Sequence, residues 1–232
     1  MLVLASASPR RRELLTQAGF TFQVHPAHIP EDPYPNEDPI AYVTRLAREK
    51  AEAVFAELAL NVHPEVVLKG HDFSRAESDS KETRALAPEA LSSKGPPYTP
   101  ASLPRASAPP LVVLGADTTV TLDNQILGKP EDATDAARIL RLLSGRTHRV
   151  ITGVAVVTAT HTEVAAEVTG VQFLTLSDEE IAAYIATGEP MDKAGAYAIQ
   201  GRAARWIPRI QGDYFNVVGL PLALVSTLLE SS

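Results

Sequence analysis

The sequence has no cysteine among its 232 residues. Disulfide bonds, thiolate metal sites and a cysteine nucleophile are therefore excluded, and a reducing compartment fits this composition. The chain also lacks an apolar run long enough to cross a bilayer, and the apolar stretch at residues 2–5 is too short for the core of a signal peptide. We therefore expect a cytoplasmic globular protein without a membrane partner.

Several common binding motifs are missing as well. The sequence contains no Walker-type loop and no G-x-G-x-x-G segment after a predicted strand, and its six histidines lack a metal-binding spacing such as H-E-x-x-H. A formal net charge of -7 and a pI near 5.4 argue against general nucleic-acid binding, so no nucleic-acid partner is expected. Any anion site in this chain must therefore be local and built in another way.

One such candidate is a basic cluster at the start of a helix predicted over residues 9–18. Ser8 is a typical N-cap residue, Pro9 is typical of the first helical position, and arginines at 10–12 fill the first turn. A helix N-terminus is locally positive, so each cation there costs roughly 0.3–1 kcal/mol unless an anion joins it. The cluster is interpreted either as a phosphate site or as solvated basic residues near a helix start.

Apolar periodicity predicts alternating strands and helices along the chain. Strands are expected over residues 2–5, 20–24, 111–114 with an extended continuation at 119–122, 126–127, 150–157, 164–174 and 206–210. Helices are expected over residues 9–18, 39–58, 132–143 and 178–186, and from residue 221 onward. This order predicts an α/β fold with a mixed, twisted sheet and flanking helices.

The stretch at residues 69–110 interrupts this pattern. It is rich in Ser, Pro and Ala and has no hydrophobic period, so we expect a disordered insertion without a catalytic role. Similar Val-Val-Leu segments flank it at residues 66–68 and 112–114, and we expect the second copy to form the strand. Asp72, which follows the first copy, is therefore not expected in a site. The chain is then one domain over residues 1–232 with an insertion.

Lys50 is a charged residue on the apolar side of the helix predicted over residues 39–58. It lies four residues from both Leu46 and Val54, which belong to the apolar stripe. A lysine at such a position either snorkels to solvent or points into a site. Both interpretations stay open on the local sequence alone.

Asp117 follows the apolar strand at 111–114, where ligands meet open α/β sheets, although a turn aspartate also fits there. Lys50, Lys129, Lys193 and the arginine cluster have no assigned acidic partner nearby in the sequence. This excess of positive charge beside a carboxylate suggests a phosphate together with a metal ion. An unperturbed aspartate is a poor general base, but a carboxylate that holds Mg²⁺ beside a water can help to generate hydroxide.

Seven motifs in order resemble the Maf-like nucleoside triphosphate pyrophosphatases. They are residues 5–11 (ASASPRR), 46–51 (LAREKA), 115–118 (GADT), 128–130 (GKP), 143–148 (LSGRTH), 192–201 (DKAGAYAIQG) and 217–221 (VVGLP). The resemblance implies two lobes around a central cleft, as in the Maf and ITPase-like folds. It also implies hydrolysis of a nucleoside triphosphate to the monophosphate and pyrophosphate, with a divalent cation, expected to be Mg²⁺ with Mn²⁺ as the alternative. The insertion departs from the family pattern.

The resemblance also suggests roles for single residues. Asp117 matches the proton acceptor, and Lys50 and Lys129 are the further catalytic positions, which bind phosphate. Glu31 and Asp117 match the metal ligands. The substrate-binding positions are Ser6, Ser8, Arg10, Arg11, Thr118, Lys193 and Gln200. A homodimer is implied too.

Base preference is implied by Arg11, Thr118 and Gln200, which match the branch that acts on dTTP and UTP. A glutamine amide can donate to a pyrimidine O4 and accept from its N3–H at the same time, which agrees with this branch. The alternatives are a pyrophosphatase of the 7-methyl-GTP type and a non-catalytic nucleotide-binding regulator of septum formation. The intact Asp117 and the three lysines favour the enzyme.

Overall fold

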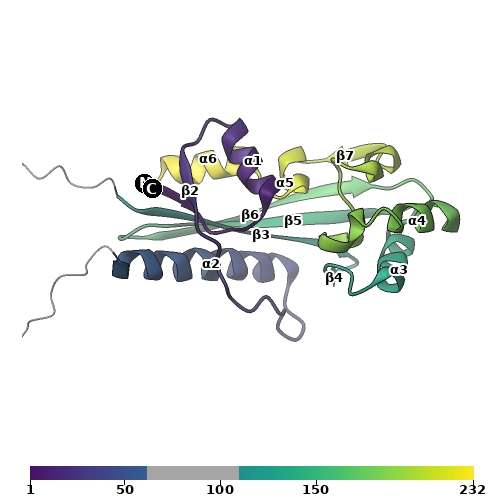
Figure 1. The fold of residues 1–232 in the computed structure, drawn as a ribbon, viewed down its shortest axis with the longest axis horizontal. Helices are drawn as coiled ribbons and strands as arrows, with labels where there is room; N and C mark the ends of the chain where they lie inside the picture. Colours follow the sequence, from purple (N-terminus) through teal and green to yellow (C-terminus); the bar gives the residue numbers. More distant parts are fainter. Residues whose placement is uncertain (62–109) are drawn as a thin grey trace, which may run out of the picture. The chain divides into compact units, whose positions relative to one another are not determined.

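The computed structural model describes residues 1–61 and 110–232, which share one seven-stranded mixed sheet (Figure 1). The strands run in the order β2-β1-β3-β5-β6-β7, and β4 pairs with β3. Their bounds are β1 Leu2–Leu4, β2 Phe22–Val24, β3 Val112–Leu122, β4 Gln125–Leu127, β5 Thr147–Val157, β6 Thr162–Gln172 and β7 Arg209–Gln211. The expected disordered insertion, apart from Pro110, and Asp72 lie outside the described residues.

The N-terminal unit is a β-α-β crossover, which explains why β1 and β2 pair in parallel. Its helix, α1 (Pro9–Gln17), begins at the predicted N-cap, where the Ser8 side chain accepts from the backbone N–H of Arg11. Strand β1 also pairs in parallel with β3, so that Leu2 faces Val112. The second Val-Val-Leu copy therefore forms the strand, as predicted.

Helix α2 (Pro39–Asn61) lies directly on the backbone of the sheet. A Cβ atom on Gly115 of β3 would be 2.1 Å from the carbonyl oxygen of Ala47, and one on Gly153 of β5 would be 2.3 Å from that of Val43. Figure 1 shows α2 below the sheet, while α1, α5 and α6 lie above it. Both glycines thus permit a close approach between helix and sheet.

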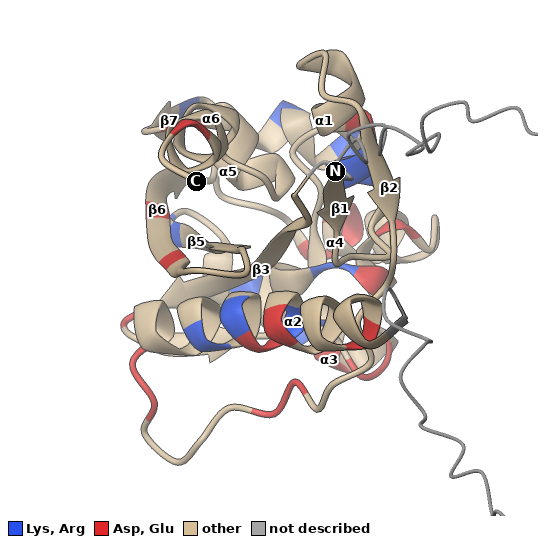
Figure 2. Ribbon diagram, turned by 90° about the vertical axis from the view of Figure 1, so that its left-hand side faces the viewer, with Lys and Arg blue, Asp and Glu red and all other residues tan. Residues whose placement is uncertain are grey.

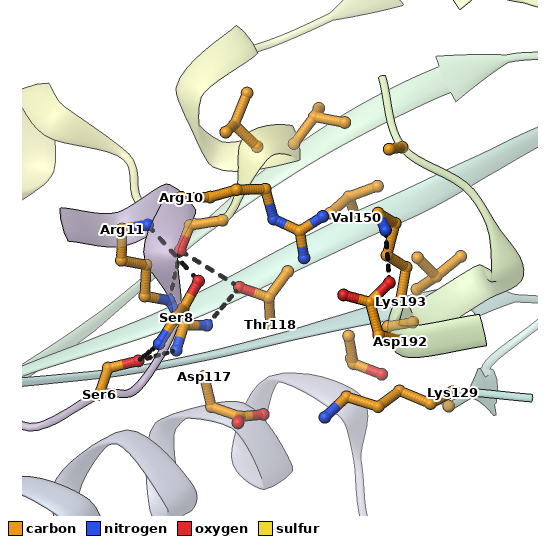
Figure 3. Close-up of a pocket in the computed structure, with 18 of the residues that line it drawn as sticks. Ser6, Ser8, Arg10, Arg11, Asp117, Thr118, Lys129, Val150, Asp192 and Lys193 are labelled. Atoms are coloured by element: carbon orange, nitrogen blue, oxygen red, sulfur yellow. Dashed lines mark hydrogen bonds and ion pairs between the residues drawn. The ribbon is translucent and has the colours of Figure 1, made fainter. Parts of the chain in front are cut away.

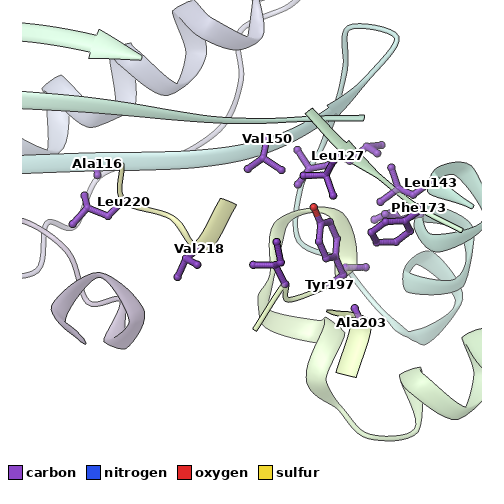
Figure 4. Close-up of a cluster of buried hydrophobic side chains, with 14 of the residues drawn as sticks. Ala116, Leu127, Leu143, Val150, Phe173, Tyr197, Ala203, Val218 and Leu220 are labelled. Carbon is purple, nitrogen blue, oxygen red and sulfur yellow. The ribbon is translucent and has the colours of Figure 1, made fainter. Parts of the chain in front are cut away.

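The remaining helices are α3 (Ala133–Leu143), α4 (Asp178–Ile185), α5 (Tyr214–Val218) and α6 (Leu222–Glu230), with 3-10 helices η1 (Glu189–Asp192), η2 (Ala194–Ala196) and η3 (Arg202–Trp206). Helices α3 and α4 gather at one end of the long strands, and α1, α2, α5 and α6 gather toward the other (Figure 1). Leu127, Leu143 at the end of α3, and Phe173 belong to one buried apolar cluster (Figure 4). Within the described ranges, no helix is both long and apolar enough to cross a membrane.

The predicted α/β class is confirmed, but the strand predicted over residues 206–210 starts too early, because β7 spans Arg209–Gln211. Trp206 instead ends η3 and is 3% exposed, with its indole N–H donating to Glu180 at 3.3 Å. Pro208 has no backbone N–H to give to a ladder, so β7 begins only after it, at Arg209. The short helix α5 and the three 3-10 helices were not predicted, because they are too short to show a period.

A buried histidine joins this sheet to the segment that follows η2. His148 on β5 is 1% exposed, and its Nε2 lies 2.8 Å from the hydroxyl of Tyr197. Burial lowers the pKa of His148 to about 4 and raises the pKa of Tyr197. The imidazole is therefore neutral in the folded protein at physiological pH.

This histidine should make the protein sensitive to acid. Since the unfolded chain binds a proton here near pH 6.5 and the folded protein only near pH 4, the free energy of unfolding should fall by up to about 3 kcal/mol between these pH values. Denaturant titrations at a series of pH values measure this loss. His148→Gln should be less stable than the wild type at neutral pH, and the gap should narrow as the pH falls. A stability difference between the two proteins that stays constant with pH would contradict the lowered pKa of His148.

Candidate active site

A cavity of about 530 Å³ opens between the helices above the sheet and α2, a volume in the usual range for small-molecule sites. Its walls come from regions that are far apart in the sequence, namely the turn into α1, the loop after β2, helix α2, strand β3, the turn after β4, and the segments around η2 and α5. Six of the seven sequence motifs contribute residues to it. Figure 3 shows how the side chains converge on this cleft.

Lys50 lies between two carboxylates in the cleft. Its Nζ is 2.6 Å from Oε1 of Glu31 and 2.7 Å from Oδ1 of Asp117. Lys50 is 7% exposed and Asp117 8%, whereas the side chain of Glu31 is about half exposed. Lys50 therefore points into a site and does not snorkel. Both acidic partners come from distant segments of the chain, which is why the sequence near Lys50 does not supply one.

The two carboxylates have opposite pKa shifts. Burial raises the pKa of Asp117, against the charges of Lys50 and Arg11. Burial also acts on Glu31, but the hydrogen bond from Lys50 and the charges of Lys50, Lys129 and Arg11 outweigh it and lower the pKa of Glu31. Carboxylates whose pKa values are driven apart suit different roles, one as a proton acceptor and one as a permanent anion.

These two carboxylates fit a divalent cation that is shared with substrate. In residues 1–61 and 110–232, no group of three His, Asp or Glu side chains is placed to hold a metal ion. Mg²⁺, however, is commonly bound by one or two carboxylates together with substrate phosphates. Since Glu31 and Asp117 both contact the same ammonium group, their carboxylates lie close enough to serve as such a pair.

Arg11 is held in place by the protein. Its Nε donates to the carbonyl of Gly219 at 2.8 Å, its Nη1 to Ala116 O at 2.9 Å and Ser6 Oγ at 3.2 Å, and its Nη2 to Thr118 Oγ1 at 2.9 Å. Burial lowers the pKa of Arg11, with the charge of Asp117 acting in the opposite direction. Arg11 is thus fixed before any ligand binds.

The basic cluster at the start of α1 divides between cleft and solvent. Arg10 and Arg11 line the cleft, together with Ser6 and Ser8, whereas Arg12 is exposed. Figure 2 shows blue segments of the ribbon, which mark Lys and Arg, at α1 beside β1. Of the three arginines, the two that the family resemblance assigns to substrate binding are the ones that line the cleft.

The other predicted site residues also line the cleft. Figure 3 shows the ammonium end of Lys129 directed toward Asp117. Lys193 donates to the carbonyl of Glu189 at 2.7 Å and contacts the carboxylate of Asp192, so it has an acidic neighbour that the sequence interpretation did not assign. Gln200 lines the cleft with an exposed side chain.

Tyr42 was missed by the sequence interpretation. It lines the cleft, and its hydroxyl donates to the backbone carbonyl of Glu31 at 2.8 Å, which fixes the loop that carries this carboxylate. Burial raises the pKa of Tyr42 to about 12. Tyr42 lies eight residues before Lys50 on α2, so a search for polar residues on the same helix face as Lys50 could have found it.

Arg45 holds the same loop from the next turn of α2. Its guanidinium makes two hydrogen bonds to Glu37, at 2.7 and 2.8 Å, donates to the carbonyl of Asp32 at 3.2 Å and stacks on Tyr34 at 4.0 Å. A bidentate arginine contact of this kind is directional as well as strong. The loop that carries Glu31 is therefore attached to α2 at Glu31 itself, through Tyr42, and just after it, through Arg45.

Fold and cleft together define the class of an α/β protein with a mixed sheet and a cleft lined by arginine and lysine side chains. Within that class, the chain belongs to the Maf-like protein family, whose model matches residues 1–232. The family resemblance drawn from the seven sequence motifs is thereby confirmed.

Curated relatives cover nearly the whole chain. A dTTP/UTP pyrophosphatase of Koribacter versatilis is 45% identical over 229 residues, which are 99% of this chain and 93% of the relative. Proteins with the same name from Aromatoleum aromaticum and Moorella thermoacetica are 42% and 44% identical, over 99% and 98% of this chain and 94% and 93% of the relatives. Similarity over both full lengths includes every region that contributes to the cleft.

Proposed function

We propose that this protein hydrolyses dTTP and UTP to the nucleoside monophosphate and pyrophosphate. The observation that carries the proposal is the placement of Lys50 between Glu31 and Asp117, in a cleft whose other walls carry Arg10, Lys129 and Lys193. A triphosphate needs several cations, and its hydrolysis needs a proton acceptor. The names of the three relatives support the same activity.

In the proposed reaction, water attacks phosphorus at the α–β phosphoanhydride, the bridging P–O bond breaks, and pyrophosphate leaves. Asp117 accepts the proton of the water, a role for which its raised pKa suits it better than an ordinary aspartate. Lys50, Lys129, Lys193 and Arg10 stabilise the charge that develops on the phosphate oxygens. When bound by Glu31 and Asp117, Mg²⁺ or Mn²⁺ supplies further positive charge to the triphosphate.

The finer assignments belong to the same proposal. We propose Mg²⁺ as the physiological cation, a homodimeric assembly, a cytoplasmic location and no nucleic-acid partner. Pyrophosphate release should be measured with UTP, dTTP, CTP, GTP and 7-methyl-GTP at equal concentrations, with Mg²⁺ and with Mn²⁺. Preference for 7-methyl-GTP would overturn the branch assignment. Tight triphosphate binding without release would favour the regulator over the enzyme.

Gln200→Ala should weaken base selectivity. The exposed amide lines the cleft and is free to meet a base, so its loss should lower the preference for UTP over purine triphosphates by about tenfold, the effect of one or two hydrogen bonds. The ratio of kcat/KM values measures this change. Gln172→Ala, a matched loss of an exposed amide at the end of β6, should leave the ratio unchanged. Equal changes in both variants would exclude a role for Gln200 in base reading.

A further inference from the structure

A chain of hydrogen bonds runs from Arg11 through the sheet to helix α5. Arg11 Nη2 lies 2.9 Å from Thr118 Oγ1 on β3, which lies 3.0 Å from Thr152 Oγ1 on β5, the residue directly opposite in the ladder. Thr152 Oγ1 lies 3.1 Å from the carbonyl oxygen of Asn216 on α5. Thr152 and Asn216 are both 0% exposed, whereas Thr118 lines the cleft. The proposed reaction does not use Thr152.

The direction of each hydrogen bond in this chain follows from its two ends. A guanidinium has only donors, so Thr118 accepts from Arg11, and a carbonyl has only lone pairs, so Thr152 donates to Asn216. The single proton of Thr152 is thereby used, and Thr118 must be the donor between the two threonines. The other acceptor near Thr118, the carbonyl of Gly219, is farther away at 3.4 Å, so the hydroxyl proton makes the shorter hydrogen bond to Thr152 at 3.0 Å.

Thr118 is therefore left with one free lone pair and no free proton. Arg11 has five N–H groups, and four of them are used on Gly219, Ala116, Ser6 and Thr118. After the contacts with residues 1–61 and 110–232 are counted, what remains for a ligand is one N–H of Arg11 beside one lone pair of Thr118. The cleft thus presents a donor next to an acceptor in a fixed arrangement.

This pair lies where a base is the suitable ligand. Both residues contact the carbonyl of Gly219, and the neighbouring Val217 and Val218 give this part of the cleft an apolar wall. Uracil and thymine carry a carbonyl next to a ring N–H, which matches a donor next to an acceptor. Cytosine carries an amino group next to an unprotonated ring nitrogen. Its amino donor would face the N–H of Arg11, and its ring nitrogen, an acceptor, would face the lone pair of Thr118.

We propose that Thr152 is a positioning residue for base selectivity. Its Oγ1 accepts the hydrogen bond of the Thr118 hydroxyl, so that Thr118 can only accept a hydrogen bond from a ligand. This arrangement favours uracil and thymine over cytosine. The proposal rests on the proposed function for the kind of ligand. It assigns the ring N–H of the base to Thr118, whereas the sequence interpretation assigned it to Gln200. Gln200 is then left to contact another group of the base.

The test compares three variants of the full-length protein. Thr152→Val keeps the shape of the side chain but removes the acceptor, so the Thr118 hydroxyl can turn and donate to a base. Thr152→Ser keeps the hydroxyl. Thr169→Val is the matched control, because it removes another buried threonine hydroxyl that contacts Asn216, at 2.9 Å, but lies outside the chain from Arg11.

Two readouts should be taken for each variant. The first is the affinity for UMP, CMP and GMP by calorimetry, which does not require turnover, and the second is kcat/KM for UTP, CTP and GTP. Thr152→Val should lower the preference for uracil over cytosine by about tenfold in both readouts. It should leave the preference for uracil over guanine unchanged within about twofold, because guanine also carries a carbonyl next to a ring N–H. Thr152→Ser and Thr169→Val should keep the wild-type preferences for uracil over cytosine and for uracil over guanine.

Failure of the inference and failure of the function give different results. A wild-type protein that prefers UMP to CMP, with the ratio lost in Thr152→Val, would support the inference even if no triphosphate were hydrolysed. An unchanged uracil-to-cytosine ratio in folded Thr152→Val, or no preference in the wild type, would overturn it whatever the turnover. Equal loss in Thr169→Val would also overturn it, since the effect would then come from a general disturbance around α5.

Discussion

Asp117→Asn is expected to lower the rate of pyrophosphate release by about a hundredfold to ten-thousandfold while the fold stays intact. The amide keeps the shape of the side chain but cannot accept the proton of the attacking water, and general bases contribute typically 10²–10⁴-fold. Triphosphate binding should largely survive, because Lys50 keeps its contact with Glu31 and the other cations are unchanged. Single-turnover pyrophosphate release, triphosphate calorimetry and thermal unfolding measure the three effects separately.

The matched control for this variant is Asp192→Asn. Asp192 also lines the cleft, but its carboxylate is largely exposed and contacts Lys193, so its loss should change KM more than kcat. Asp72→Asn should have no effect on turnover. Near-normal turnover in folded Asp117→Asn, or loss of activity only in Asp72→Asn, would refute the assignment of the proton acceptor.

Lys50→Met should reduce kcat by at least about a hundredfold, because a charge that stabilises the transition state in a buried site is lost. It should also destabilise the protein. From the sequence alone, a lysine on an apolar stripe suggests that methionine would stabilise the fold or leave it unchanged. The structure reverses this expectation, since the substitution leaves two neighbouring carboxylates without their shared partner.

We expect the free energy of unfolding of Lys50→Met to fall by about 3 kcal/mol, at the lower end for breaking a buried ion pair, because Glu31 is half exposed. Urea titration and pyrophosphate release measure the two effects. Arg48→Met is the matched control, because Arg48 lies on the same helix and its ion pair with Glu52, at 4.0 Å, is exposed to solvent. Unchanged kinetics in Lys50→Met would mean that the ammonium group plays no part in the reaction.

Local signals in the sequence were sufficient to predict most of the fold. The N-cap at Ser8 and the capping box at Ser177 place the starts of α1 and α4, and the apolar run at residues 111–114 predicts the strand that pairs with β1. The prediction failed where one signal overrode another, as at Trp206, whose apolar character suggested a strand although Pro208 prevents pairing there. Periodicity also cannot detect a helix as short as α5.

The candidate site was predictable only in part. Lys50 was conspicuous because it interrupts an apolar pattern, and Asp117 because it follows an apolar run. The expectation that Asp117 lies past the end of its strand is wrong, because β3 continues to Leu122. Their contact with each other and with Glu31 joins three segments that are far apart in the sequence, so no local pattern predicts it. Thr152 carried no signal at all, because a threonine in an apolar strand is an ordinary β-former.

Gly115 and Gly153, which contact α2, determine the distance between Lys50 and Asp117 although neither glycine takes part in that contact. Lys50 reaches Asp117 at 2.7 Å because the helix rests on bare backbone at Gly115 and Gly153, and Gly153 is the residue paired with Asp117 in the ladder. A methyl group at either position would lift the helix and carry the ammonium group away from the carboxylate. The distance between Lys50 and Asp117 thus depends on two positions that have no side chain. A substitution at either glycine can therefore inactivate the protein without changing a residue of the proposed reaction.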